Sequence, residues 1–196
     1  IGGKSLSFKF CSGLFRDAAL FADSLEVSLE NEFLPFLYPN QYVNFTPDSA
    51  SSKLALSIIS EDASDVDALQ AVYNYVVQNL TYDYDLADTV DSGYIPDVDS
   101  TLKSGKGICF DYAALTTAML RARDIPCKLQ IGYSGTVKHA WISVYIRSKG
   151  WVDKAVEFSG ESWSRMDPTF DSNSKDKENI QQYIGDDDNY SVQFTR

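Results

Sequence analysis

Long hydrophobic runs are missing from this sequence. No stretch of about 18 apolar residues occurs, and a helix needs roughly that length to cross a bilayer. The opening stretch IGGKSLSFKF also lacks the basic and then apolar pattern of a signal peptide. We therefore expect no transmembrane segment, whereas export stays open because a cleaved signal peptide would leave no trace.

Basic residues are scarce relative to acidic ones. The 196 residues include 17 Lys and Arg against 28 Asp and Glu, which gives a net charge of -11. Nucleic acids and anionic lipid surfaces are bound mainly through Lys and Arg side chains that neutralise phosphate charge. We therefore expect no nucleic-acid partner.

Cysteine and histidine are few as well. The chain has three cysteines, Cys11, Cys109 and Cys127, and one histidine, His139. They form no C-x-x-C pair and no Cys and His spacing of a structural zinc site. The acidic run DDDNY near the C-terminus lacks the spacing of an EF-hand. We expect no metal, no cofactor and at least one free thiol.

Apolar residues, at 44% of the chain, suffice to close the core of a single domain. The polar stretch TPDSASSK precedes LALSIIS, a predicted strand, and marks a seam in the chain. We interpret residues 1–60 as an N-terminal elaboration of the same domain and residues 61–196 as its core. Within the first part, alternation at Leu6, Phe8 and Phe10 predicts a short strand, and FRDAALFADSLEVSLENEFLPF predicts a helix.

The rest of the pattern predicts an α+β fold. Apolar spacing of three and one predicts an amphipathic helix over 64–80, and a long surface loop follows over 81–107. A helix with apolar residues on most faces is predicted over 109–123. A two-residue period then predicts strands at CKLQIGY, KHAWISVYI and GWVDKAVEF, with RMDPTF as a short fourth element. This order predicts a central buried helix packed on an antiparallel sheet.

Cys109 would stand in the first turn of that buried helix, directly after GKG. A helix N-terminus presents unpaired amides and the positive end of the helix dipole, which favours a thiolate and lowers the pKa of the cysteine. The same amides could stabilise an oxyanion, and Gly105 and Gly107 allow a tight approach. A lone cysteine is, however, more often a small buried apolar residue, so the interpretation depends on its partners.

A thiol nucleophile needs a base, and the base needs an orienting acceptor. His139 is the single histidine, and a two-residue period places it on a polar and aromatic strand face with Trp141, Ser143 and Tyr145. Asp167 precedes Pro168, which restricts it to extended geometry at the end of a later strand. Taken alone, His139 could be structural and Asp167 a turn cap; together with Cys109 they predict a catalytic set.

These residues resemble the transglutaminase-like superfamily, whose core is related in arrangement to papain-type cysteine peptidases. The resemblance rests on GKGICFDYAAL, RARDIPCK, HAW and MDPTF, which occur in that order. Asp124 departs from the family pattern, which has glycine before Ile-Pro. The resemblance implies Cys109 as nucleophile, His139 as proton carrier and Asp167 as the group that holds the imidazole. It also implies an oxyanion donor ahead of the cysteine, with Tyr82 and Tyr84 as the available hydroxyls.

The implied function is thiol-dependent acyl transfer on an amide bond of a protein or peptide, a cell-wall component included. Because the chain is short and similar to compact microbial members, we expect a cysteine peptidase or amidase. A protein-glutamine transglutaminase or deamidase is the alternative, and a non-catalytic binding module is the second. An extracellular or envelope location is expected, with a cytoplasmic one as the alternative.

Overall fold

The computed structural model describes residues 5–11, 22–28, 31–91, 93–153, 158–159, 162–163 and 190–196. The chain divides into two compact units, Ile1–Pro35 and Phe36–Arg196. In the first unit, β1 (Ser5–Cys11) pairs antiparallel with β2 (Ala22–Ser28). The strand at Leu6–Phe10 is confirmed, but the helix predicted over 15–36 is wrong where the structure describes Ala22–Ser28 as β2. Alternation of polar and apolar residues within ADSLEVS is the two-residue period of a strand.

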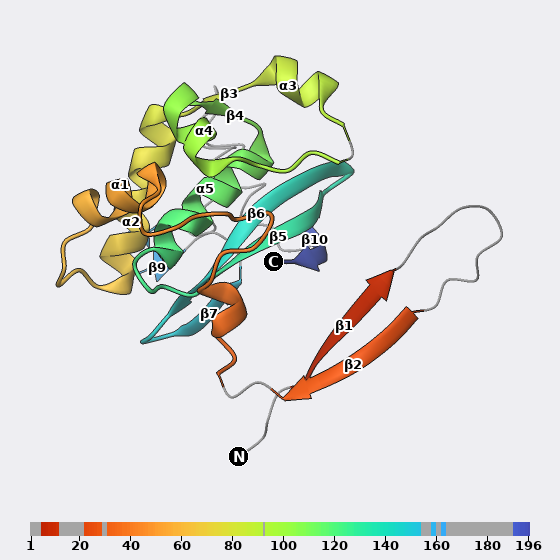
Figure 1. Ribbon diagram of the computed structural model, residues 1–196. Helices are drawn as coiled ribbons and strands as arrows, with labels where there is room; N and C mark the ends of the chain where they lie inside the picture. Colours follow the sequence, from red (N-terminus) through yellow and green to blue (C-terminus); the bar gives the residue numbers. More distant parts are fainter. Residues whose placement is uncertain are drawn as a thin grey trace. The chain divides into compact units, whose positions relative to one another are not determined.

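The second unit packs helices against an antiparallel sheet (Figure 1). The sheet order is β10 (Tyr190–Thr195), β5 (Cys127–Ser134), β6 (Val137–Ile146) and β7 (Gly150–Asp153). The α+β prediction, with a central helix on an antiparallel sheet, is therefore confirmed. The elements that follow the 3-10 turn Leu34–Phe36 are α1 (Ala50–Ile58), α2 (Asp65–Asn79), β3 (Thr81–Tyr82), α3 (Tyr84–Thr89), α4 (Val98–Ser104), β4 (Lys106–Gly107), α5 (Cys109–Arg121), β5 (Cys127–Ser134), β6 (Val137–Ile146), β7 (Gly150–Asp153), β8 (Phe158–Ser159), β9 (Ser162–Trp163) and β10 (Tyr190–Thr195).

Helix α5 is the centre of this unit. It packs against α1, α2 and α4 on one side and against β5 and β6 on the other. Every residue from Asp111 to Arg121 is buried, because neighbours surround the helix. The predicted helix over 109–123 is confirmed to within two residues of its end. Asp124 follows in the left-handed conformation, with φ 57°, and this conformation favours glycine, the residue of the family pattern at this position.

The predicted strand LALSIIS is wrong, because its first five residues belong to α1 and the sixth, Ile59, is the C-cap of that helix. Asp99 of α4 accepts hydrogen bonds from the amides of Ala50 and Ser51, both at 3.0 Å, and from the Ser51 hydroxyl at 2.8 Å. A distant carboxylate thus satisfies the helix N-terminus, and α1 buries Ala55 against the core. The interpretation of residues 1–60 as an N-terminal elaboration stays a prediction. Helix α1, which lies within that range, packs on α5.

The prediction of a continuous surface loop over 81–107 is also wrong. This stretch contains α3 and α4, and its two ends pair as the parallel strands β3 and β4. Asp83 caps α3 by accepting from the amide of Leu86, and Asp97 caps α4 by accepting from the amide of Ser100. Aspartates that favour turns also favour helix N-caps, and these two start short helices.

The helix at 64–80 and the first two predicted strands are confirmed. The Ser64 side chain caps α2 by accepting from the amide of Asp67. Of GWVDKAVEF, residues Gly150–Asp153 form β7, and RMDPTF lies outside the described residues. The described helices include none long and apolar enough to span a bilayer.

Candidate active site

The nucleophile predicted from the sequence stands at the first position of α5. Ile108 precedes it in extended conformation as the N-cap. The carboxylate of Asp111 turns back and accepts a hydrogen bond from the Ile108 amide at 2.8 Å. This hydrogen bond holds the helix start in place. The thiol of Cys109 is half-buried, so the first side chain of the helix stays accessible.

The two glycines ahead of the cysteine have separate structural reasons. Gly105 ends α4 in the left-handed conformation, with φ 63°, which L-residues seldom adopt. A Cβ at Gly107 would lie 2.5 Å from the Cβ of Asp111. Glycine at 107 therefore permits the close approach of Asp111 that fixes the helix N-terminus.

Asp111 is buried, at 1% exposure. Besides the Ile108 amide it accepts a hydrogen bond from the Tyr94 hydroxyl at 2.7 Å. Burial raises the pKa of Asp111, and these two donors counter part of that rise. Asp111 therefore has a structural role: it ties the segment after α3 to the start of α5.

The strands β3 and β4 bring Tyr82 in front of the cysteine. The Thr81 amide donates to the Gly105 carbonyl at 2.8 Å, and the Asp83 amide donates to the Gly107 carbonyl at 2.9 Å. Burial, and then the neighbouring Cys109 thiolate, raises the pKa of Tyr82 to about 12. Its hydroxyl therefore keeps its proton at neutral pH and can act as a donor.

Tyr84, the other hydroxyl proposed from the sequence, is 63% exposed. Its ring packs edge-on against that of Tyr82, with the centroids 4.9 Å apart. Tyr82 lines the pocket described next, whereas the set of described lining residues does not include Tyr84. Of the two tyrosines, only Tyr82 stands at the site.

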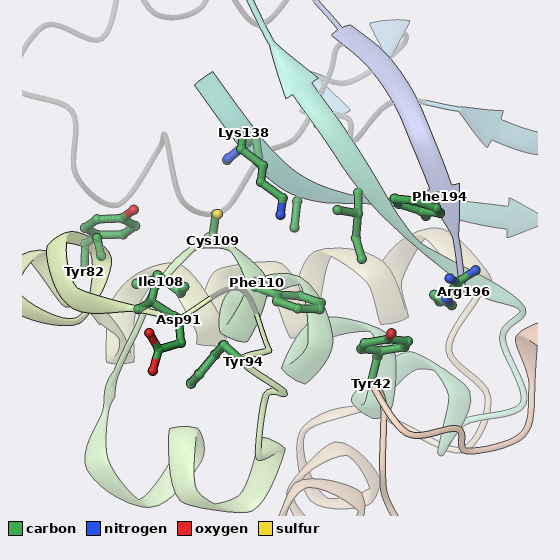
Figure 2. A pocket seen from close by; sticks show the side chains of 15 residues that line it. Tyr42, Tyr82, Asp91, Tyr94, Ile108, Cys109, Phe110, Lys138, Phe194 and Arg196 are labelled. Atoms are coloured by element: carbon green, nitrogen blue, oxygen red, sulfur yellow. The ribbon is translucent and has the colours of Figure 1, made fainter. Parts of the chain in front are cut away.

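A pocket of about 420 Å³ opens over the start of α5. Cys109 of α5 and His139 of β6 both line it. Figure 2 shows Cys109 among the side chains that line the pocket. Asp167 lies outside the described residues, so the three-residue catalytic set stays a prediction. The described lining residues are Tyr42, Tyr82, Ala87, Val90, Asp91, Tyr94, Ile108, Cys109, Phe110, Ile131, Lys138, His139, Ala140, Phe194 and Arg196.

His139 lies on a strand that is buried on both faces. The expected apolar face, with Ala140 and Ile142, packs into the core. The polar and aromatic face is also covered, and His139 is only 5% exposed. Its ring stacks at 6.2 Å on that of Trp141 and lies 6.3 Å from that of Tyr190 on β10. These aromatic rings fix the position of the imidazole.

Cys127 differs sharply from Cys109. Cys127 begins β5 and is fully buried, and burial raises the pKa of its thiol to about 11. Its sulfur donates to the Thr117 hydroxyl at 3.5 Å. It is a structural thiol with no access to solvent. Among the described residues, no group of three His, Cys, Asp or Glu side chains could hold a metal ion.

The pocket also contains residues that sequence reasoning missed. Lys138 directly precedes His139, and Arg196 follows β10. Tyr42, from the segment before α1, and Phe194 complete that end of the pocket. They come from distant parts of the chain, so no local pattern marks them; only the position next to the single histidine could have drawn attention to Lys138.

The family model of the transglutaminase-like superfamily matches residues 52–168, more than half of the chain. The chain belongs to this superfamily. Membership places it among cysteine-dependent hydrolases and transferases.

Known proteins similar to the chain include the mouse kyphoscoliosis peptidase, 26% identical over 53% of this chain and 17% of that protein. A candidate cysteine protease of Cytophaga hutchinsonii has a similar structure, with a TM-score of 0.51, 24% identity and coverage of 72% of this chain and 43% of that one. The periplasmic domain of TgpA from Pseudomonas aeruginosa gives a TM-score of 0.51, 19% identity and coverage of 73% and 49%. The match thus spans less than half of each of these proteins.

Proposed function

We propose that the protein is a cysteine peptidase or amidase that cleaves an amide bond in a protein or peptide. The observation that carries the proposal is the meeting of Cys109, at the N-terminus of a buried helix, with the single histidine at one pocket. The fixed geometry of the helix start supports the proposal. That geometry depends on the glycines at 105 and 107 and on the carboxylate of Asp111.

In the proposed first step, His139 takes the proton of the Cys109 thiol, and the sulfur attacks the carbonyl carbon of the substrate amide. Negative charge then develops on the carbonyl oxygen. The amides of the first helical residues lack partners within the helix, so the Cys109 amide is one donor to this oxygen. The Tyr82 hydroxyl, protonated at neutral pH, is the second.

When the carbon–nitrogen bond breaks, the leaving amine takes the proton from His139 and a thioester remains on Cys109. Water, deprotonated by His139, attacks the thioester, and the carboxylic acid leaves as the thiol regains its proton. Asp167 would accept from the imidazole and hold its tautomer throughout. An amine in place of water would give transamidation, the alternative that membership of this superfamily keeps open.

The proposed location is the cell envelope or the outside of the cell, with a protein or peptide substrate there. The structural similarity to a periplasmic domain supports this location. The half-buried Cys109 thiol would require protection from oxidation in that compartment.

Alkylation and turnover test the function. Iodoacetamide at pH 6 should label Cys109 at least tenfold faster than Cys127, because the Cys109 thiol is accessible at the pocket whereas Cys127 is fully buried and burial raises the pKa of its thiol. Cys109→Ala should abolish release of new amines from a peptide library, whereas Cys127→Ala should retain it. Equal, slow labelling of both thiols, or turnover that survives Cys109→Ala, would contradict the proposal.

Adding glycine ethyl ester to the same library separates the two reactions. Mass spectra that show only the mass of added water identify a hydrolase, and spectra that show incorporated amine at glutamine identify a transglutaminase. His139→Ala should lower either rate by at least a hundredfold, since the thiol would lose its base.

A further inference from the structure

Two cations line the pocket of a chain whose net charge is -11. Lys138 comes from β6 and Arg196 from the segment after β10. Within the described residues neither forms an ion pair with a carboxylate. Asp91 is the single acidic side chain among the described lining residues, so the pocket is locally richer in positive charge than the molecule as a whole.

Arg196 is held in place by its backbone. Its amide donates to the Leu129 carbonyl and its carbonyl accepts from the Leu129 amide, both at 2.8 Å. The same carbonyl accepts from the Arg121 guanidinium at 3.0 Å. Arg121 is itself buried, and it also binds the carbonyls of Tyr38 and Cys127. The start of the Arg196 side chain is therefore fixed by the core.

The guanidinium of Arg196 lies among aromatic rings. Its central carbon is 5.4 Å from the ring centroid of Tyr42 and 5.3 Å from that of Phe194. A guanidinium that contacts ring faces keeps its in-plane N–H groups available, and this is the geometry that binds a carboxylate with two parallel hydrogen bonds. One of these groups donates to the Thr195 carbonyl at 3.1 Å, which leaves others for a ligand.

An aromatic floor connects this end of the pocket with the thiol. Figure 2 shows Cys109, Tyr82 and Lys138 toward one end and Tyr42, Phe194 and Arg196 toward the other, with Phe110 between them. The Phe110 ring centroid lies 5.9 Å from that of Tyr42. A bound chain would therefore cross an apolar surface before it reaches the guanidinium, and removal of water there strengthens charge pairing.

We propose that this pocket selects substrates that carry a carboxylate on the same side of the scissile amide as Arg196. An apolar or aromatic residue of the substrate then lies between that carboxylate and the scissile amide. The inference rests on the proposed function and adds the class of substrate: an acidic peptide. Arg196 binds the carboxylate, and Lys138 adds positive charge close to the reacting thiol. A Glu or Asp side chain and a peptide terminus both supply such a carboxylate, since the chemistry is the same.

Peptide binding to the Cys109→Ala protein tests this selection without turnover. Four fluorescent peptides share one sequence and differ only in the test group: a Glu side chain, a Gln side chain, a free C-terminal carboxylate or a C-terminal amide. We expect the Glu peptide, the free-acid peptide or both to bind about tenfold more tightly than the neutral partner, because hydrogen bonds to a charged group are involved. The arm that shows the difference identifies the source of the carboxylate.

Variants then assign the difference to Arg196. In the Cys109→Ala background, Arg196→Gln should weaken binding of the acidic peptides about tenfold more than binding of the neutral peptides and so remove the preference, and Arg196→Lys should keep part of it. Lys138→Gln should weaken the preference less, and Lys103→Gln, an exposed lysine on α4, should leave it intact. Thermal unfolding checks that each variant is folded.

Two results would overturn the inference. One is equal affinity for acidic and neutral peptides in both arms; the other is an equal loss of acidic and neutral binding on Arg196→Gln in a folded protein. Failure of the proposed function would look different, since peptides could then bind with the expected preference while the unsubstituted enzyme cleaves none of them.

Discussion

At the scale of single residues, the motif that begins at Gly105 is explained by backbone geometry and one buried carboxylate. The left-handed Gly105, the contact of Gly107 with Asp111 and the bond from Asp111 to the Ile108 amide are all local. Such local requirements leave a signature in the amino-acid pattern. The position of Cys109 at a helix start is therefore predictable from the residues around it.

Other residues of the pocket left no such signature. Arg196 enters the pocket because β10 pairs with β5, and Tyr42 enters from the segment ahead of α1. Neither pairing follows from spacing along the chain, since each depends on contacts between distant segments. Sequence reasoning thus predicts the nucleophile and its base but not the surface that would select a substrate.

Asp124 offers a test of backbone strain. An L-residue in the left-handed region costs about 1 kcal/mol, although Asp tolerates it better than most, and glycine removes this cost at some loss of entropy. We expect Asp124→Gly to raise the free energy of unfolding by about 0.5 kcal/mol and Asp124→Ala to lower it by about 1 kcal/mol. Urea denaturation with an unchanged m-value measures both, and a glycine variant less stable than the alanine variant would contradict the argument.

At the scale of elements, the errors of prediction have one physical origin. LALSIIS contains β-branched residues that favour a strand, yet the chain forms α1 because a carboxylate from α4 caps it and α5 offers it a surface. Asp83 and Asp97 lie in a stretch whose composition favours a loop, although each caps a helix. Local patterns identify the elements with a strong period of their own, namely α2, α5, β5 and β6.

The cap between α4 and α1 can be removed by one substitution. Asp99→Ala leaves the amides of Ala50 and Ser51 without their acceptor and should lower the free energy of unfolding by about 1–2 kcal/mol. Asp85→Ala is the matched control, because Asp85 is exposed in the first turn of α3, and its effect should stay within about 0.5 kcal/mol. Equal effects of the two substitutions in urea denaturation would show that the cap contributes nothing.

At the scale of the whole molecule, the succession of helices and then an antiparallel sheet is predictable from the sequence, whereas the order of strands is not. β10 lies beside β5 and not beside β9, the strand that precedes it among the described residues. Gly132 of β5 permits this pairing, since a Cβ there would clash with the carbonyl oxygen of Ser191. Such a steric requirement depends on two strands far apart in the chain, so no local pattern reveals it.

One ion pair joins the start of α2 to the residue that follows β6. Arg147, just after β6, binds the buried carboxylate of Asp65 through its backbone amide at 2.8 Å and its guanidinium at 2.8 Å and 3.0 Å. Burial alone would raise the pKa of Asp65, but the hydrogen bonds from Arg147 bring it below its ordinary value. A lowered pKa in the folded state contributes stability above the unfolded pKa of about 3.9.

That contribution should disappear as pH falls through the folded pKa of Asp65, because the carboxylate is then protonated in both states. Arg147→Gln should therefore lower the free energy of unfolding by about 1 kcal/mol at pH 7 and by less at pH 3. The exposed pair of Lys53 and Asp48, 3.6 Å apart, provides the control, and Lys53→Gln should change little at either pH. If urea denaturation gave Arg147→Gln the same loss at pH 3 as at pH 7, the charge of Asp65 could not be the cause, and the packing of the Arg147 side chain would have to explain the loss.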